Sequence, residues 1–557
     1  MRGDSDPGRP GRAYTLLLLA FGLLYLALLG VRPLFNPDEG RYVDIPAEML
    51  ASGDYILPHL NGLAYLEKPP LHYWLSAGAL AVFGHTEWAG RLVTALAALL
   101  GALTVLKLGT RLYDPIRARF AAVMTGSMLL YVLMGQLTTL DMLLSTWLTI
   151  AIAAFCLAQT DRRTNPTSNL QWMLVCWAAM GLATLTKGLI GIVIPGSILV
   201  LYTLLQRDWQ TWRHLHLGKG ILLLAVLVVP WFVLVERVYP GAFDFLIIRE
   251  HFQRYLTKMH DRYEPWWFFI EIIAAGTLPW LPQIIRAYWT GWRPRVKHGQ
   301  FDAEKVLWIT AVFVVVFFSI SDSKLGPYVL PVLPVLALLG SQTDPAGERL
   351  LTWNGRLLCV LGIAALLAAA SAGHHETRLM QSWRIGQLRP WMVAVGVLCV
   401  SGGLATLWAT QRARFHSARI TVGATGFAVV MMLVTGAFTS IATIYSVKPL
   451  LSRVGPLDPK GTIYTVRDFD WTLPFYVRHP VIPVAYVGEL EMGLRANPSG
   501  GLESTADFEQ VWTDQSDPVG KPVYALLRIE DFKRYAAEGF PMRELARDFD
   551  HVFVSRW

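Results

Sequence analysis

The chain has 557 residues, of which 54% are hydrophobic and only 16% are charged, and its formal net charge is +8. Soluble domains carry about 25% charged residues, so this composition excludes an ordinary soluble protein and indicates a membrane protein with many spans. The basic excess does not indicate a nucleic-acid partner, because Lys and Arg collect in the connections between apolar runs, as in cytoplasmic loops.

Thirteen apolar segments are predicted to span a membrane, since a span needs about 20 mostly apolar residues and fewer where its ends snorkel. They are 14–31, 88–107, 119–135, 140–158, 171–187, 188–205, 220–236, 267–286, 306–320, 326–341, 356–372, 391–409 and 420–445. Segment 71–83 is also apolar, but it is short and follows Pro69-Pro70. We expect it to form an interfacial or re-entrant helix rather than a span.

The positions of basic residues predict the orientation. With the N-terminus in the cytoplasm, every inner connection is basic, as the positive-inside bias requires. These connections are 107–119, 162–163, 207–219, 286–305, 349–356 and 412–419. We therefore predict a multi-pass membrane protein in which the chain after residue 445 lies outside the cytoplasm.

Residues 446–557 have a different composition from the spans. Four β-like runs (Thr462–Val466, Val481–Val487, Val523–Arg528 and His551–Ser555) alternate with helix-like runs at Ala506–Trp512 and Ile529–Glu538. This pattern predicts a small α/β domain. The predicted architecture is an α-helical polytopic domain over 1–445, with outer loops 32–87 and 237–266, followed by an α/β domain over 446–557 outside the cytoplasm; the resemblance described below implies that this compartment is the periplasm.

The first outer loop begins with the charged stretch Asn36-Pro37-Asp38-Glu39. Asn36 is expected to cap a helix, with Pro37 at the first helical position and Glu39 closing a capping box. Asp38 in the first turn feels the positive end of the helix dipole, which favours its ionised form. The simpler alternative is that Asp38 and Glu39 only cap the helix.

A helix from this start to about Leu50 would place Asp38, Arg41 and Tyr42 on one face, since residues three and four apart are neighbours. Glu67 and Lys68 lie in the same loop. Further ionisable residues fall in the other outer connections: Asp141, Lys187, the cluster Arg249 to Arg262, Asp322 and Lys324. Ionisable groups at membrane depth are costly, so their presence indicates a functional site.

The mixture of charges narrows the chemistry. Arg binds a phosphate bidentately and Lys binds it as a point charge. A nearby carboxylate suits an acceptor group or a metal ion. A lipid-linked phosphosugar at headgroup depth meets these requirements.

At these residues the chain resembles a known family. The motifs N-P-D-E-x-R-Y at 36–42 and Y-x-E-K-P-P-L-x-Y-W at 65–74, with Asp141 and Lys324…Tyr328, are similar to those of the C-type glycosyltransferases that use polyprenyl phosphates. Among these the chain looks most like the aminoarabinose transferases, which are relatives of the protein O-mannosyltransferases. The resemblance covers nearly the whole chain.

The resemblance implies transfer of 4-amino-4-deoxy-L-arabinose from undecaprenyl phosphate to the phosphates of lipid A, at the periplasmic face of the inner membrane. This change lowers the negative charge met by polymyxin and other cationic antimicrobial peptides. The implied partners are the undecaprenyl-phosphate-linked sugar donor, lipid A and membrane lipids, with neither nucleic acid nor an obligate protein partner.

The resemblance also assigns roles to individual residues. Asp38 and Asp141 are expected to be catalytic carboxylates, and Glu39 and Lys324 are additional candidates. The expected lipid-phosphate site consists of Arg41, Tyr65, Lys68, Arg254 and Tyr328. Glu67 is expected to help bind a divalent metal ion, and no other cofactor is implied. The register of Arg254 is open, because Arg249 and Arg262 share its loop.

Other interpretations are open from the sequence alone. Asp141 could simply cap the span that follows it, Lys68 could be a snorkelling interfacial lysine, and Lys187 could end a span. The acceptor could instead be a protein or another glycan. A lipid transporter is a further alternative, but transporters usually place ionisable groups near the bilayer midplane rather than in outer connections.

Overall fold

The computed structural model describes residues 8–247, 264–293, 296–371, 382–514 and 522–556. The chain forms two compact units. The first, here called the helical unit, comprises Met1–Leu29 and Leu92–Ala437. The second, the mixed unit, comprises Gly30–Arg91 and Phe438–Trp557. The first outer loop thus belongs to the same compact unit as the C-terminal tail, although our division at residue 445 groups it with the spans.

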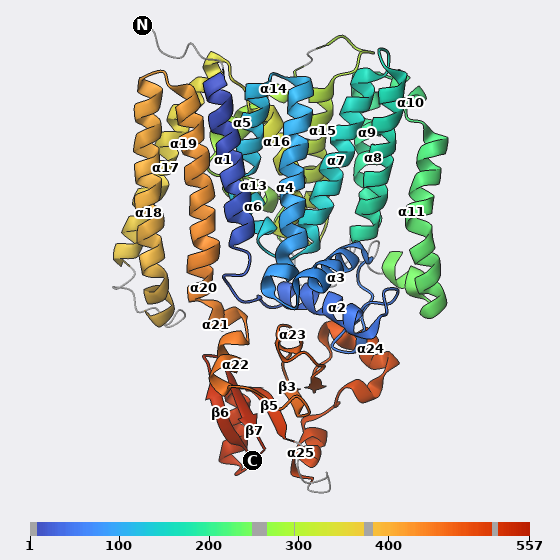
Figure 1. The fold of residues 1–557 in the computed structure, drawn as a ribbon, viewed down its shortest axis with the longest axis vertical. Helices are drawn as coiled ribbons and strands as arrows, with labels where there is room; N and C mark the ends of the chain where they lie inside the picture. Colours follow the sequence, from blue (N-terminus) through green and yellow to red (C-terminus); the bar gives the residue numbers. More distant parts are fainter. Residues whose placement is uncertain (1–7, 248–263, 294–295, 372–381, 515–521, 557) are drawn as a thin grey trace. The chain divides into compact units, whose positions relative to one another are not determined.

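The helical unit contains long apolar helices that lie side by side (Figure 1). Their bounds are α1 Gly8–Ala27, α4 Glu87–Leu112, α5 Pro115–Thr125, α6 Leu129–Gly135, α7 Leu140–Asp161, α8 Pro166–Lys187, α9 Ile190–Gln206, α10 Gln210–Arg213, α11 Leu217–Val238, α13 Phe268–Gly276, α14 Leu281–Gly291, α15 Ala303–Ile320, η2 Gly326–Val329, α16 Val332–Gly340, α17 Pro345–Ser371, α18 Ser382–Gln411, α19 Phe415–Met432 and the π-helical turn η3 Leu433–Ala437. The first five residues of α4 belong to the mixed unit.

Seven helices among the described residues are long and apolar enough to cross a membrane, or eight if the bent pair α5–α6 forms one span. The pair is bent by 65°. Several other predicted spans form shorter or broken helices. The run 267–286, for example, gives α13 and α14, which are separated near Pro279, a residue that cannot donate a backbone hydrogen bond. The chain is therefore a polytopic helical membrane protein, and the count of thirteen spans stays a prediction.

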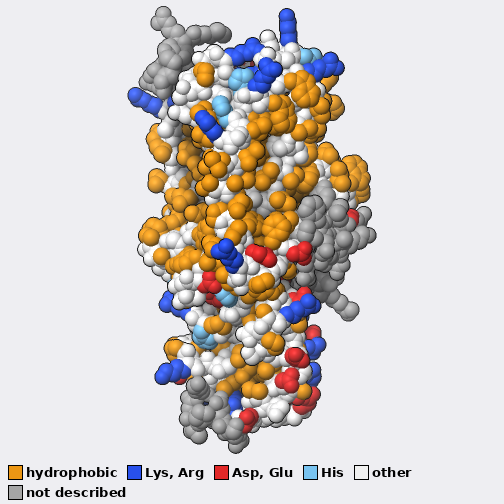
Figure 2. Space-filling view, turned by 90° about the vertical axis from the view of Figure 1, so that its right-hand side faces the viewer, with side chains coloured by type: hydrophobic (Ala, Val, Ile, Leu, Met, Phe, Trp, Pro, Cys, Tyr) orange, Lys and Arg blue, Asp and Glu red, His pale blue; other side chains and the backbone are white. Residues whose placement is uncertain are grey.

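The surface of the helical unit has the charge pattern of a membrane protein. Figure 2 shows hydrophobic side chains over its flank, with Lys and Arg side chains gathered at its upper end. Ion pairs join the basic connections there: Arg111–Asp161 at 2.7 Å, Arg162–Asp208 at 2.8 Å, Arg286–Asp344 at 2.6 Å and Arg117–Glu304 at 3.5 Å. The connections that the sequence assigns to the cytoplasm thus lie against one another, as alternating spans require.

Small residues bring helices α17 and α18 into close contact. A Cβ atom added at Gly362 would lie 2.7 Å from the carbonyl oxygen of Gly396, and one added at Gly403 would lie 2.7 Å from that of Gly355. In a membrane, such glycine contacts let helix backbones approach and gain van der Waals packing.

The N-terminal part of the mixed unit is α2 (Asp38–Ser52), a hairpin of β1 (His59–Leu60) and β2 (Leu63–Ala64), and α3 (Leu71–Phe83). Asn61 and Gly62 form the hairpin turn, with φ of 56° and 72°. An Asn-Gly pair suits this left-handed backbone, because glycine has no Cβ and Asn tolerates positive φ. The predicted helix at 71–83 is confirmed, and its place relative to a membrane stays a prediction.

The C-terminal part of the mixed unit contains short helices and a five-stranded sheet. The bounds are α20 Phe438–Ser440, α21 Ala442–Tyr445, α22 Lys448–Val454, β3 Thr462–Val466, α23 Leu473–Val477, β4 Ile482–Val484, η4 Gly488–Leu490, α24 Glu491–Ala496, η5 Pro498–Gly500, α25 Thr505–Thr513, β5 Val523–Arg528, α26 Ile529–Ala537, β6 Arg543–Arg547 and β7 His551–Ser555. The strand order is β4-β3-β5-β7-β6. Strands β4, β3 and β5 are parallel, whereas β7 runs antiparallel to both β5 and β6.

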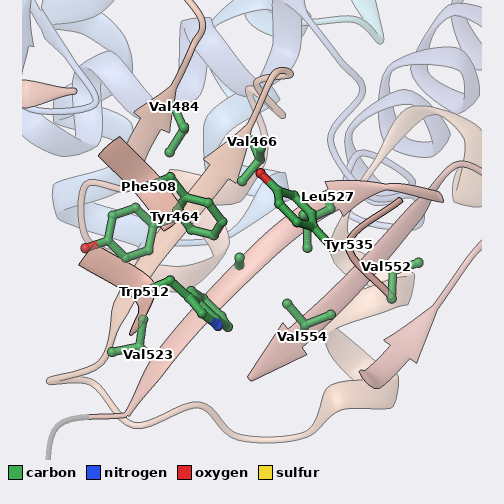
Figure 3. Packing of buried hydrophobic residues seen from close by; sticks show 11 residues of the cluster. Tyr464, Val466, Val484, Phe508, Trp512, Val523, Leu527, Tyr535, Val552 and Val554 are labelled. Atoms are coloured by element: carbon green, nitrogen blue, oxygen red, sulfur yellow. The ribbon is translucent and has the colours of Figure 1, made fainter. Parts of the chain in front are cut away.

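The core of this domain lies between the sheet and its helices. In Figure 3, valines from the central strands face the aromatic side chains Phe508, Trp512 and Tyr535 of α25 and α26. Each of these three aromatic residues is fully buried. The small α/β fold that the sequence predicts for this region is confirmed.

One detail of the predicted helix start is wrong. Helix α2 begins at Asp38 with Pro37 at its N-cap, and no side chain caps it. The side-chain amide of Asn36 instead donates to Asp470 at 2.7 Å, and its oxygen accepts from the backbone N–H of Thr472 at 3.2 Å. Asn36 therefore fastens the start of α2 to the tail, a distant partner that the local sequence does not indicate.

Candidate active site

The charged face of α2 forms as the sequence predicts. Arg41 Nη2 donates to Asp38 Oδ1 at 2.6 Å, across one turn of the helix. The two side chains differ in exposure: that of Asp38 is 52% exposed and that of Arg41 is 5% exposed. An accessible carboxylate therefore sits on a buried, fixed cation.

The β1–β2 hairpin places Tyr65 beside this pair. The hairpin is held on both sides, because the Asn61 side chain exchanges two 2.7 Å hydrogen bonds with the backbone of Val481 and the Gly62 N–H donates to Glu48. Tyr65 follows directly, and its hydroxyl accepts from Arg41 Nη1 at 3.1 Å. Burial raises the pKa of Tyr65, so its hydroxyl keeps its proton and remains a donor.

Arg41 is also enclosed by aromatic rings. Its guanidinium lies 5.2 Å from the ring centre of Tyr42 and 5.4 Å from that of Trp471, within the range of cation–π attraction. Burial alone would lower the pKa of Arg41, but Tyr65, Tyr42 and Asp38 raise it above its ordinary value. The cation is therefore permanent, which suits a phosphate site.

The tail adds an anion that the sequence did not single out. Glu489, in the turn η4, forms an ion pair with Arg41 Nη1, and its Oε2 accepts from the Tyr65 hydroxyl at 3.4 Å. Tyr65 and Glu489 are 424 positions apart. No local motif marks Glu489, and only the fold brings it to the cluster.

Glu67 and Lys68 lie at the edge of the same cluster. Lys68 is 8% exposed and its Nζ donates to the Glu67 carbonyl oxygen at 2.8 Å. The Glu67 carboxylate is near enough to Arg41 to help raise its pKa. A lysine that is buried as a whole and bonded to its own loop favours a site residue over the simpler alternative of a snorkelling lysine, which keeps its charged head in water.

The predicted role of Glu67 in metal binding gains no support. Among the described residues, no group of three His, Cys, Asp or Glu side chains is placed to hold a metal ion. The carboxylates of Asp38 and Glu489 instead pair with Arg41. A metal-binding role for Glu67 stays a prediction.

Glu39 has a different environment from Asp38 beside it. Its carboxylate is 2% exposed and pairs with Arg32 and, at 2.8 Å, with Arg91 Nε. Burial would raise the pKa of Glu39, but the two arginines lower it to about 2. With both oxygens engaged inside the protein, Glu39 fixes the start of α2, and we infer a structural role instead of the expected one as a site candidate.

The helical unit contains a second charged cluster. Asp141, in the first turn of α7, forms an ion pair of 2.5 Å with Lys187 at the end of α8. The Lys187 ammonium also lies 5.0 Å from the ring centre of Tyr328. Lys324 is 5% exposed near Tyr328 in the chain. Lys187 contacts both Asp141 and Tyr328, and these three residues come from three different connections between helices. This arrangement favours more than the end of a span for Lys187.

One predicted site residue lies outside the described residues. Arg254 belongs to the range 248–263, as do the other basic residues of that loop that compete with it. Its assignment to the phosphate site stays a prediction.

Comparison with known proteins decides the family. Undecaprenyl phosphate-alpha-4-amino-4-deoxy-L-arabinose arabinosyl transferase 1 of Sodalis glossinidius is 33% identical over 413 residues, which cover 72% of this chain and 71% of that protein. The chain belongs to this family of arabinosyl transferases. The transferase of the same name from Edwardsiella ictaluri is 32% identical, over 73% of this chain and 74% of its own.

A solved structure shows that the likeness extends over the whole fold. The crystal structure of ArnT from Cupriavidus metallidurans bound to undecaprenyl phosphate matches with a TM-score of 0.85 and 31% identity, and the match covers 98% of each chain. The apo form matches with a TM-score of 0.84. The arabinosyl transferase fold is thus present here from the first helices to the tail.

Two domain families match separate parts of this arabinosyl transferase. Residues 67–233 match the family described as dolichyl-phosphate-mannose-protein mannosyltransferase, and residues 453–556 match the aminoarabinose transferase C-terminal domain. The first match begins at Glu67, in the motif next to Arg41, and the second contains Trp471 and Glu489. The enzyme is therefore a glycosyltransferase, not a transporter.

Proposed function

We propose that the enzyme transfers 4-amino-4-deoxy-L-arabinose from undecaprenyl phosphate to a phosphate of lipid A, at the periplasmic face of the inner membrane. The observation that carries this proposal is the Asp38–Arg41–Tyr65 cluster. It combines a buried cation and a neutral donor, which suit the donor phosphate, with an accessible carboxylate for the reacting sugar. The sugar and its carrier are those named for the family's relatives.

The reaction is a single displacement at the anomeric carbon. A phosphate oxygen of the acceptor forms the new bond while the bond from the anomeric carbon to the donor phosphate oxygen breaks, and undecaprenyl phosphate leaves with the electron pair. Negative charge grows on the departing phosphate. Arg41 and Tyr65 stabilise that charge, with Lys68 as a further cation, because fixed donors in a poorly hydrated site are worth several kcal/mol.

Asp38 has two tasks available to it in this reaction. A phosphate monoester is already largely ionised at neutral pH, its second pKa being about 6, so no strong base is needed. The carboxylate of Asp38 instead positions the acceptor and stabilises positive charge that develops on the sugar ring. Its exposure and its place next to Arg41 support this role.

The cluster of Asp141, Lys187 and Tyr328 in the helical unit is proposed to be functional and not only structural. A carboxylate paired with a lysine at the first turn of a helix is more costly to maintain in a membrane protein than a neutral cap. The ion pair at a helix end, together with an aromatic ring near the ammonium, supports a role beyond capping.

Mass spectrometry of lipid A from cells with and without the gene tests the proposed function. The expected result is an added pentosamine on lipid A phosphate that depends on the gene and is lost in Asp38→Ala and Lys68→Ala variants expressed at equal levels. Unchanged lipid A in all strains would contradict the proposed acceptor.

A second candidate function is transfer of a polyprenyl-linked sugar to a protein hydroxyl. The match of residues 67–233 to the protein mannosyltransferase family favours it. A hydroxyl acceptor needs a general base to remove its proton. Transfer to a hydroxyl would therefore require Asp38 to be ionised and to accept that proton, whereas transfer to a phosphate does not. Loss of a glycoprotein signal, rather than of modified lipid A, in the gene deletion would select this alternative.

A further inference from the structure

Glu489 forms an ion pair with Arg41, the cation that the proposed function assigns to the donor phosphate. Its carboxylate pairs with Arg41 Nη1 and accepts from the Tyr65 hydroxyl. These are the same two donors that would stabilise a phosphate. A carboxylate and a phosphate are interchangeable partners for an arginine fork, since both present oxygens at the right spacing.

Arg41 also has an unused donor. Its Nε is buried and has no hydrogen-bond partner among the residues that the structure describes. A buried donor left without an acceptor costs about 1–3 kcal/mol. The hydrogen-bonding capacity of this guanidinium is therefore incomplete, and a ligand with several oxygens would complete it.

Of the two carboxylates on Arg41, Glu489 is the exchangeable one. Asp38 is fixed one turn away on the same helix, so it stays near Arg41 whatever binds. Glu489 lies in the short 3-10 turn η4, next to Gly488 at φ +42°, and its side chain is 33% exposed. Its side chain can turn toward solvent without movement of α2.

We propose that Glu489 is a resident counter-ion that holds the phosphate site of Arg41 and Tyr65 closed and is displaced when the donor phosphate binds. Displacement conserves the ion pair on Arg41 and the hydrogen bond from Tyr65. The tail thereby selects for anionic headgroups, because only an anion can replace a carboxylate on a buried guanidinium without leaving that charge unpaired. This inference rests on the proposed function of the cluster.

The test is binding of undecaprenyl phosphate, and of uncharged undecaprenol as a control ligand, to the purified full-length protein. Glu489→Gln should bind undecaprenyl phosphate about tenfold more tightly than wild type, because an apparent dissociation constant falls as the fraction of open sites rises. Binding of undecaprenol should not change. In a transfer assay, the KM for the donor should fall without a rise in kcat.

A matched control is Glu491→Gln, two residues further on. Glu491 pairs with Arg495 on the surface of α24, so its loss should leave phosphate binding unchanged. Glu489→Ala is a second variant that removes the same charge and should give the same direction as Glu489→Gln. Thermal unfolding checks that each variant is folded.

The outcomes distinguish the counter-ion role of Glu489 from the phosphate site formed by Arg41 and Tyr65. Equal or weaker binding of undecaprenyl phosphate by both Glu489 variants would overturn the counter-ion role while leaving the phosphate site intact. If wild-type protein did not prefer undecaprenyl phosphate to undecaprenol, the phosphate site itself would be wrong, and the counter-ion role would fail with it.

Discussion

Arg41 Nη2 donates a 2.6 Å hydrogen bond to Asp38 Oδ1, one turn earlier in α2. This bond joins the residue proposed to hold the donor phosphate to the residue proposed to act at the sugar. The tail domain takes part in the same cluster, because Trp471 lies over the Arg41 guanidinium and Glu489 pairs with it. The cluster therefore depends on both ends of the mixed unit's sequence.

Replacing Arg41 by Lys should impair transfer although the charge is kept. Lysine is a point charge and cannot supply the two directed donors that Arg41 aims at Asp38 and Tyr65. Since a hydrogen bond to a charged group contributes about 1.5–3 kcal/mol, we expect kcat/KM to fall by about 10- to 100-fold. Transfer from a purified donor measures it, and wild-type kinetics in Arg41→Lys would contradict the bidentate role.

Gly40→Ala should weaken the attachment of α2 to the tail. A Cβ at Gly40 would lie 2.4 Å from the carbonyl oxygen of Trp471, where backbone must move to make room. Such overpacking costs about 1–3 kcal/mol. Gly78→Ala in α3 is the matched control, because a Cβ there meets no atom within 4 Å. A lower unfolding temperature for Gly40→Ala alone is the expected result, and equal temperatures would refute the contact.

Glu39→Gln should destabilise the protein more than it changes the chemistry. Removing the charge leaves the buried Arg32 and Arg91 without their shared carboxylate, and breaking a buried pair in this way costs about 3–5 kcal/mol. The measurement is the free energy or temperature of unfolding. A stable but inactive Glu39→Gln protein would instead make Glu39 a catalytic residue.

The lowered pKa of the Glu39 carboxylate predicts that acid reduces the stability of the protein. The pKa of Glu39 is lowered to about 2 from an ordinary value of 4.5. The ion pair therefore stabilises the fold fully above about pH 4.5, and this contribution is lost as the pH falls toward 2. Unfolding followed across this window should show a smaller loss in Glu39→Gln than in wild type. An equal loss would show that other groups govern acid unfolding.

A charge swap distinguishes a structural from a functional Asp141. The double variant Asp141→Lys with Lys187→Asp keeps an ion pair between α7 and α8, so it should recover stability relative to Asp141→Lys alone. If the carboxylate at position 141 is functional, transfer should stay at least tenfold below wild type. Recovery of both stability and transfer would show that the Asp141–Lys187 ion pair has only a structural role.

The local parts of the fold could be predicted from the sequence. The bounds of β3, β5 and β7 agree with the apolar runs that predicted them, because each is a buried strand flanked by turn residues. The sequence does not indicate strand β6. Its residues Arg543–Arg547 are mostly charged or half-buried at the edge of the sheet, so they carry no strand pattern.

The site was predictable only where it depends on residues that are close in the sequence. Asp38 and Arg41 were paired because helical spacing alone makes them neighbours, and the structure confirms it. Glu39 looked equivalent to Asp38 in sequence, yet its partners Arg32 and Arg91 lie on other segments and enclose it. Glu489 could not be found at all, because its contact with Arg41 exists only after the tail has folded onto the first loop.

The most direct test of the proposed active site uses Asp38→Asn, which keeps the size and polarity of the side chain but removes its charge. We predict that the purified variant binds undecaprenyl phosphate as wild type does, because the proposed phosphate ligands Arg41 and Tyr65 are unchanged and Asp38 is proposed to act at the sugar. Transfer of the aminosugar to lipid A, followed by mass spectrometry, should fall by at least about a hundredfold, a loss of the size found when one electrostatic stabiliser of a reaction is removed. Transfer at the wild-type rate by a folded Asp38→Asn protein would contradict the assignment of chemistry to this face of α2.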